Sequence, residues 1–360
     1  MVAALASLLL LGFLVIVHEL GHFIAARWFG VRVLRFSVGF GPRLLAWKRG
    51  HTEYAVSAIP LGGYVKMSGE QRTTDSAEPW DYIAKPIGTR AAIIVAGPLV
   101  NYLAALVTLW IVFVIGYPEL LPVVGKVVDR MPAQTIGIQV GDQIQSVDGT
   151  AVRTWEEMTK HIYEAPNHPL TLVIERKGAS RTLTVTPQSK TITDPLGHPK
   201  TIGLIGIAPS GAYTSYRVGP IAAIGRAVHQ QNEWTQQTMI ALWSMMTGRT
   251  SLRDSVTGPI GLVYLTSEAA EVGIAPLLFL ASLFGLSLAI FNLFPIPILD
   301  GGHLFFLVIE KLRGRPVSLN VQERSTQVSF VLLMALVLMI CVNDINRFGL
   351  LDKMVGWVRR

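Results

Sequence analysis

The residues best suited to chemistry lie near the start of the chain, in the run His18-Glu19-Leu20-Gly21-His22. On a helix, side chains four residues apart lie one turn above one another on the same face, so both imidazoles can bind one metal ion. Glu19 then lies beside them, within reach of a water molecule on that ion. The spacing predicts a zinc site that carries its own general base.

The stretch before this motif predicts a membrane helix. Residues 1–17 contain no charged residue, and Ser7 is the one overtly polar side chain among them. Such a run is long enough to enter a bilayer, where ionisable side chains are so costly that they normally serve a function. A helix end with interfacial histidines is the plainer alternative. We favour a metal site inside the membrane.

The composition agrees with a membrane protein. Of 360 residues, 51% are hydrophobic and 15% are charged. The net charge of +7 would suit nucleic acid, but the basic residues cluster just outside apolar runs, as the positive-inside rule describes. We therefore expect a lipid bilayer and no nucleic acid as partner. The single cysteine, Cys341, excludes a disulfide framework and a cysteine zinc site.

Four apolar runs predict a polytopic α-helical membrane protein with four transmembrane helices. Basic residues follow the first run and precede the fourth, which places these two loops in the cytoplasm and both chain ends outside. The metal site would then lie near the cytoplasmic side. The runs are residues 1–28, 91–117, 272–299 and 326–343.

Residues 31–67 have a different pattern. Apolar residues alternate with others between turn-forming glycines and prolines, which predicts a membrane-associated β-hairpin region. Open strand edges are not tolerated against lipid, so these strands must be covered by protein or line a wet cavity. The region is either a plain connection between two spans or an edge that pairs with an extended substrate. The spacing alone does not choose between them.

Residues 121–209 predict an inserted α+β domain, because short β-rich runs flank one helix at 154–163. The stretch from Met131 through Gly141-Asp142 to Gly149 resembles the signature of PDZ domains. Such a PDZ-like domain would be a spacer, or it would bind peptides or gate access. The expected domains are 1–120 with the first two spans, 121–209 as the insert, 210–272 as juxtamembrane amphipathic helices, and 273–360 with the last two spans. The helices of 210–272 would lie on the outer membrane face or pack against the insert.

The third apolar run ends in an unusual way, with Pro295 and Pro297 ahead of Asp300. Two prolines two residues apart break a helix, and unwound backbone at membrane depth normally lines a cavity or a site. A zinc ion held by two histidines needs a third protein ligand, and Asp300 is the only carboxylate in this stretch. Asp300 is therefore the candidate. His303 fits better as an outer contact or as part of the next helix.

Asn101, in the second run, has two interpretations. A buried asparagine in a membrane helix commonly joins helices together. It can also donate a hydrogen bond to a reacting oxygen.

Taken together, the motif at 18–22, the segment 292–301 and the PDZ-like insert resemble the site-2 protease family over nearly the whole chain. The resemblance implies an intramembrane zinc metalloprotease of the bacterial inner membrane, with the PDZ-like domain on the outer side. Its substrates would be transmembrane segments of single-span proteins, typically anti-sigma factors that have already lost their outer domain. By motif match, the zinc ligands would be His18, His22 and Asp300, the catalytic acid/base Glu19, and the substrate-binding residues Asn292 and Asn101.

This chain departs from the family in one respect, because some members carry two PDZ domains and only one such segment is visible here. The departure affects how substrates would be filtered, and it leaves the active-site motifs untouched.

Two rival functions follow from the same residues. A membrane scaffold that presents its PDZ-like domain would need no ionisable residues at membrane depth. Two histidines and a carboxylate also suit ferrous iron in an oxygenase. Glu19, between the histidines, argues for hydrolysis. Hydrolysis also needs water, so we expect a polar channel that opens to the cytoplasm.

Overall fold

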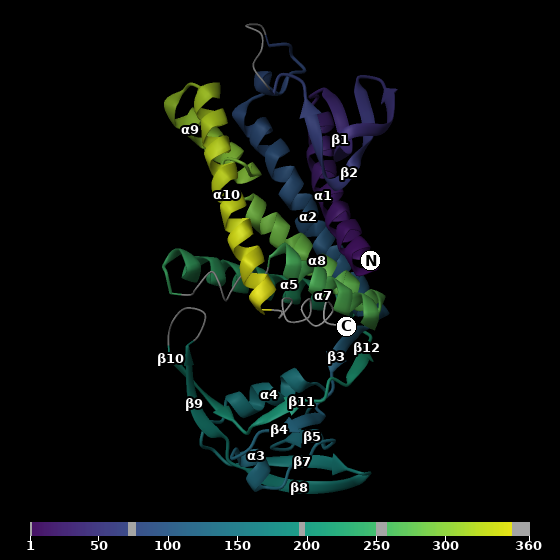
Figure 1. The fold of residues 1–360 in the computed structure, drawn as a ribbon, viewed down its shortest axis with the longest axis vertical. Coiled ribbons are helices and arrows are strands. Elements are labelled where there is room, and N and C mark those ends of the chain that lie inside the picture. The colour runs from purple at the N-terminus through teal and green to yellow at the C-terminus, as the bar shows by residue number, and fades with distance from the viewer. Residues whose placement is uncertain (1, 71–76, 194–198, 250–257, 348–360) are drawn as a thin grey trace, which may run out of the picture. The chain divides into compact units, whose positions relative to one another are not determined.

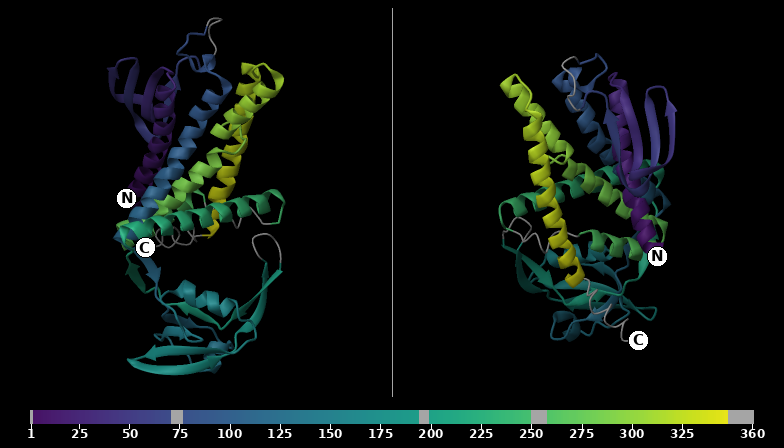
Figure 2. Two further views of the ribbon diagram at one scale, coloured as in Figure 1. Left: turned by 180° about the vertical axis from the view of Figure 1, so that it is seen from behind. Right: turned by 45° about the horizontal axis from the view of Figure 1, so that its top comes forward.

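The computed structural model describes residues 2–70, 77–193, 199–249 and 258–347. The chain forms two compact units (Figures 1 and 2). The first, the membrane unit, comprises residues 1–112, 224–235 and 253–360, and the second, the insert unit, comprises 113–223 and 236–252.

Within the described residues, four helices are long and apolar enough to cross a membrane, as expected. Many of their apolar side chains are exposed, such as Phe13 on the first helix and Leu332 on the last. Lipid rather than water would cover such faces in a bilayer. The four helices are α1 (Val2–Trp28), α2 (Ile87–Ile115), α8 (Ile274–Asn292) and α10 (Leu319–Arg347).

The expected β-region is a curled sheet made by two long strands, β1 (Val33–Arg49) and β2 (Thr52–Met67), which lies against α1. The strands bend, so that Phe36 of β1 pairs with both Val65 and Tyr54 of β2. Tyr54 pairs in turn with Trp47. The segment 63–67 therefore has a partner on one side only and forms an edge of this sheet.

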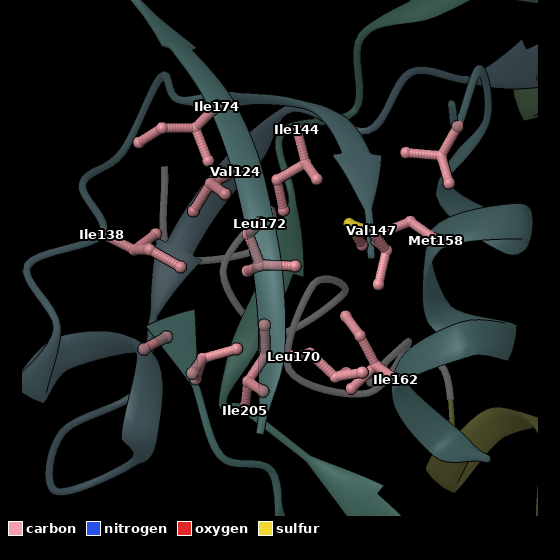
Figure 3. Packing of buried hydrophobic residues seen from close by; sticks show 13 residues of the cluster. Val124, Ile138, Ile144, Val147, Met158, Ile162, Leu170, Leu172, Ile174 and Ile205 are labelled. Atoms are coloured by element: carbon pink, nitrogen blue, oxygen red, sulfur yellow. The ribbon is translucent and has the colours of Figure 1, made fainter. Parts of the chain in front are cut away.

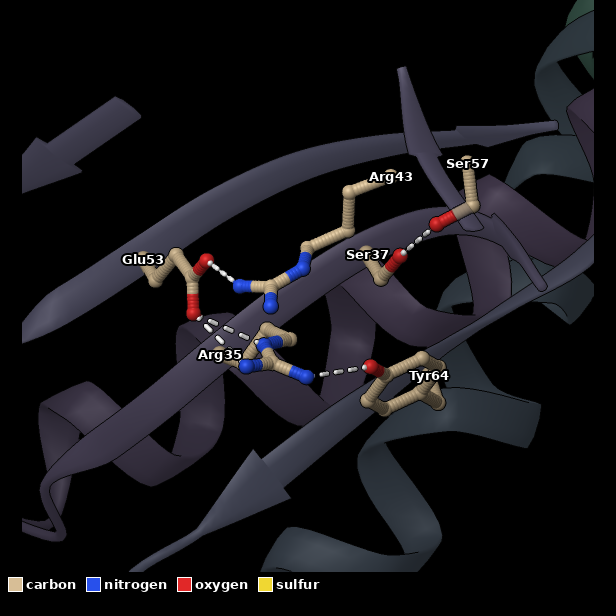
Figure 4. Close-up of polar contacts among 6 residues, drawn as sticks. All are labelled: Arg35, Ser37, Arg43, Glu53, Ser57 and Tyr64. Carbon is tan, nitrogen blue, oxygen red and sulfur yellow. Dashed lines mark hydrogen bonds and ion pairs between the residues drawn. The ribbon is translucent and has the colours of Figure 1, made fainter. Parts of the chain in front are cut away.

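A polar network ties the bent segments together (Figure 4). Glu53 accepts hydrogen bonds from Arg35 Nε at 2.9 Å and from Arg43 Nη1 at 2.6 Å. Arg35 also donates to the hydroxyl of Tyr64, 3.1 Å away. Because Tyr64 belongs to the edge segment, this network fixes the edge relative to the rest of the sheet.

Two shorter helices complete the membrane unit, α7 (Pro259–Val272) and α9 (Asp300–Arg313), with the 3-10 turn η1 (Tyr82–Ala84). The carboxylate of Asp344, on α10, is fully buried and accepts hydrogen bonds from the amides of Gly258 and Gly261 at 3.2 and 2.8 Å. It thereby caps the first turn of α7 and fastens α10 to it. Helix α5 (Pro220–Met246) contributes to both units.

The insert unit has the expected α+β arrangement. A four-stranded sheet of order β6-β5-β7-β8 and the helix α4 enclose an apolar core (Figure 3). Thr154 caps α4 by accepting a hydrogen bond from the Glu157 amide at 3.2 Å. Three further strand pairs, β4–β11, β9–β10 and β3–β12, complete the unit. Its elements are β3 (Tyr117–Leu120), β4 (Val124–Val127), α3 (Pro132–Thr135), β5 (Gln143–Val147), β6 (Thr150–Ala151), α4 (Trp155–Tyr163), β7 (Leu170–Arg176), β8 (Ala179–Val185), β9 (Gln188–Thr193), β10 (Pro199–Leu204), β11 (Ile207–Pro209) and β12 (Tyr213–Tyr216).

Candidate metal centre and active site

His18 and His22 lie one turn apart on the same face of α1, and each is 7% exposed. Their Nε2 atoms are 3.2 Å apart, and the two rings are nearly perpendicular, at 84°. Both Nε2 atoms therefore face the same small region beside the helix.

Asp300 reaches this region from the other end of the chain. Its Oδ2 atom lies 2.9 Å from His18 Nε2 and 3.4 Å from His22 Nε2. That oxygen is buried, and apart from these two imidazoles no described residue offers it a hydrogen bond. Ligands around a tetrahedral zinc ion lie about 3.3 Å from one another, given zinc–nitrogen bonds of about 2.0 Å. The three atoms thus fit zinc, and a set of three protein ligands leaves one position for water or substrate.

The broken end of α8 is what positions Asp300. Helix α8 stops at Asn292, ahead of the two prolines, and α9 starts at Asp300 itself. A side chain at Gly301 would collide with the carbonyl oxygens of residues 293 and 294, and one at Gly302 would collide with the backbone of residues 296 and 297. The loop can therefore fold tightly onto the first turn of α9 only because both positions are glycine.

Helix α2 supports both histidines from behind. The Nδ1 atom of His22 lies 2.9 Å from the Ile93 carbonyl oxygen, and Nδ1 of His18 lies 3.4 Å from the Asn101 amide nitrogen. A side chain at Gly97 would collide with both imidazoles. Gly97 therefore lets α2 approach α1 closely enough for these contacts.

Glu19 faces a cavity of about 540 Å³ beside the three potential metal ligands His18, His22 and Asp300, called the metal-ligand cluster below. The backbone of Val65, in the edge segment of β2, hydrogen-bonds to the Glu19 carboxylate. Polar side chains line the cavity from the metal-ligand cluster to the start of α10, and a channel that opens to the cytoplasm stays a prediction. They are Glu19, His22, Tyr64, Glu70, Tyr82, Arg90, Asp300, His303, Glu310, Ser318 and Gln322.

The structure places the other predicted site residues as follows. Asn292 is the half-buried last residue of α8 and is not among the residues that line the cavity. Asn101 is fully buried behind His18. His303 is in the first turn of α9 and lines the cavity, outside the cluster of three potential metal ligands found among the described residues.

Sequence reasoning missed several residues near the site. Ile93 acts through its backbone, which no side-chain pattern can reveal. Glu70 follows the predicted β-region and Arg90 precedes the second predicted span, and these sequence positions do not show that the two residues line the same cavity. Gly97 did carry a signal, since a glycine in a membrane helix marks a close approach.

Comparisons with known proteins show which family the chain belongs to. The family model of peptidase family M50 matches residues 6–336. A putative zinc metalloprotease of Rhizobium meliloti is 36% identical, over 94% of this chain and 95% of its own length. The regulator of sigma-E protease RseP of Salmonella typhimurium is 32% identical, over 95% of this chain and 98% of its own. The zinc metalloprotease RasP of Geobacillus kaustophilus is 30% identical, over 96% and 98%.

Among solved structures, the PDZ domain of an SdrC-like protein from Listeria monocytogenes is similar at 22% identity and a TM-score of 0.20, covering 24% of this chain and 84% of that one. The family match spans both halves of the metal-ligand cluster, His18 and His22 near one end and Asp300 near the other. The chain belongs to peptidase family M50, the site-2 protease family, and is an intramembrane zinc metalloprotease.

Proposed function

We propose that this protein hydrolyses peptide bonds in or near the transmembrane segments of single-span membrane proteins, of which anti-sigma factors are the typical kind. The convergence of His18, His22 and Asp300 beside a polar cavity carries the proposal. The name of one relative, a regulator of sigma-E protease, supports the link to sigma-factor control.

In this proposal the three clustered side chains hold a zinc ion. When bound, the ion polarises the scissile carbonyl and makes water more acidic. Glu19 takes the proton of the attacking water on its carboxylate and passes it to the leaving amine. The Val65 backbone bond holds that carboxylate on the cavity side of α1. Asn292, one short loop away from Asp300, is proposed to bind the substrate.

The edge segment 63–67 is proposed to bind the unwound substrate as an added strand. A transmembrane helix must unwind before hydrolysis because its amides are all bonded internally. The Val65 backbone bonds to Glu19, and the Met67 amide donates to Glu70 at 3.2 Å, so both residues face away from β1. Residues of a strand alternate in hydrogen-bonding direction, so Gly63, Val65 and Met67 point to the edge side, where their carbonyl oxygens can accept from an added strand. A strand paired there would lie directly beside Glu19.

We further propose the bacterial cytoplasmic membrane as the location, with the metal-ligand cluster near the cytoplasmic side and the PDZ-like insert (121–209) outside. The positive-inside pattern supports this orientation. The segment 1–120 would carry the first two spans and the β-region, and 273–360 the last two spans. Residues 210–272 would form the juxtamembrane helices.

Co-expression with candidate single-span anti-sigma factors tests the proposal. The wild type should shorten a true substrate, whereas Glu19→Gln should keep its metal and lose activity by orders of magnitude. Glu156→Gln, at an exposed position of the insert, is the matched control and should cleave normally. Full activity of Glu19→Gln would refute the assignment. Metal analysis of the purified protein should find zinc; iron in its place would favour the oxygenase.

A further inference from the structure

Asn101 is a buried polar residue near the metal-ligand cluster that is not among the residues lining the cavity. It is fully buried, and its amide oxygen Oδ1 has no hydrogen-bond partner among the residues that the structure describes. Its amide nitrogen lies 3.4 Å from Nδ1 of His18. The two nitrogens of an imidazole lie on opposite sides of the ring, so Asn101 touches His18 on the side away from Asp300.

The chemistry of a metal ligand decides what this contact must be. A histidine that binds a metal through Nε2 is neutral and carries its proton on Nδ1, so its outer partner has to be an acceptor. An amide nitrogen facing that proton would place one donor against another. Flipping the side-chain amide of Asn101 exchanges the positions of its oxygen and nitrogen, two atoms of nearly equal size. The oxygen then accepts from Nδ1 of His18, and the amide nitrogen takes the position that has no partner among the described residues.

The neighbouring histidine, His22, has the acceptor contact at Nδ1 that is inferred for His18. His22 has its Nδ1 atom 2.9 Å from an acceptor of α2, the Ile93 carbonyl oxygen. Ile93, Gly97 and Asn101 follow one another at four-residue intervals, so they share one face of α2. Gly97 makes room for both imidazoles, and the two residues flanking it each meet one ring.

We propose that Asn101 is a positioning residue, whose amide oxygen accepts the Nδ1 proton of His18 and so holds Nε2 toward Asp300 and the metal. It does not bind substrate. The inference rests on the proposed metal site and assigns to that site a residue from a second helix.

The test uses the purified full-length protein in detergent and three variants. Asn101→Leu keeps the branched arrangement of heavy atoms but has no acceptor, Asn101→Asp keeps an acceptor oxygen, and Ser282→Ala is the control. Ser282 is buried and donates to the Ala105 carbonyl at 2.7 Å, so its loss removes a buried hydrogen bond to α2 away from the histidines. Two properties are measured: zinc retention against a graded chelator, and the visible spectrum of the cobalt-substituted protein, which reports ligand geometry.

Asn101→Leu should bind zinc about 10- to 100-fold more weakly and should shift the cobalt spectrum, since loss of an outer contact has that effect. When fully loaded with zinc it should show a lower kcat and an unchanged KM. Asn101→Asp should stay within a few-fold of the wild type, and Ser282→Ala should match it. If Asn101→Leu is not recovered folded, Asn101→Ala provides the same comparison.

The inference would be overturned if Asn101→Leu had the same zinc affinity and cobalt spectrum as the wild type but a raised KM. Asn101 would then have a substrate-binding role. Equal losses in the Leu and Asp variants would also overturn it, because the acceptor would then not matter. Either result leaves the proposed protease function intact, since that function depends on whether the wild type holds zinc and needs Glu19.

Discussion

Arg90, near the start of α2, donates two hydrogen bonds of 3.1 and 2.5 Å from its guanidinium to the carboxylate of Glu310, near the end of α9. The side chains are 7% and 15% exposed. Helix α9 carries Asp300 in its first turn, and α2 supports the two histidines. The pair therefore fastens the helix that carries Asp300, the third proposed ligand, to the helix that supports the two histidines.

Breaking this pair should weaken the metal site from a distance. Arg90→Gln or Glu310→Gln alone leaves a buried charge without its partner, which costs about 3–5 kcal/mol in stability. The double variant should cost less than the sum of the two singles, because it leaves no unpaired charge. Thermal unfolding and zinc retention in detergent measure both effects. Additive losses would show that the two helices are held together by other contacts.

Replacing Asp300, the third proposed ligand, should lower zinc affinity without unfolding the protein. An amide at position 300 is a far poorer zinc ligand than a carboxylate, so Asp300→Asn should lose more than the about 10- to 100-fold that loss of an outer contact costs. Asp81→Asn is the matched control, since Asp81 is also buried and accepts from the Ser68 hydroxyl at 2.6 Å. Zinc content after dialysis distinguishes them. Normal zinc content and turnover in Asp300→Asn would show that Asp300 is not a zinc ligand.

Substrate pairing with the edge segment 63–67 predicts a period-two pattern along the substrate. Every second amide of an added strand donates to the edge, and the others point away. Synthetic substrates in which single peptide bonds outside the scissile bond are replaced by esters lose one N–H each. Cleavage should slow at alternate positions and stay normal at those between. A uniform effect, or none, would mean that the β-region does not hold the substrate as a strand.

The insert should lose stability in acid through one buried ion pair. Asp142 accepts from Arg176 at 2.7 and 2.6 Å and from the Gln139 amide at 2.8 Å. Burial alone would raise the pKa of Asp142, but these bonds more than offset it and hold the pKa below its usual range. Because its pKa is depressed in the folded state, Asp142 contributes stability at pH values above the ordinary aspartate pKa, about 3.9. This contribution is lost as the pH falls through the lower pKa of the folded state.

Hydrogen exchange of the β7 amides should therefore show constant protection from pH 7 to about 5, after correction for intrinsic rates, and a loss below about 4. Asp142→Asn should remove about 3 kcal/mol of protection at neutral pH. Glu175→Gln, which alters a surface bond to Gln145, should change it little. Equal protection in Asp142→Asn and the wild type at neutral pH would contradict the role of the pair.

Local rules were enough to predict much of this protein. The four membrane-length helices follow from the length of uninterrupted apolar runs, and the shared face of His18 and His22 follows from the helical period. The break after α8 follows from Pro295 and Pro297, which cannot continue a helix. Each of these properties depends on residues within a few turns of one another, so the sequence shows them directly.

Contacts between distant segments had to come from the tertiary structure. Three features depend on how helices and strands pack. They are the segment of β2 that forms the open edge, the short distance from Asp300 to the imidazoles, and the position of Asn101 behind His18 rather than in the cavity. Packing distances are set by many side chains at once, including glycines such as Gly97 whose missing atoms allow the approach. A periodic pattern predicts the face of a helix or strand on which a residue lies. Which residue it contacts on that face depends on the tertiary packing.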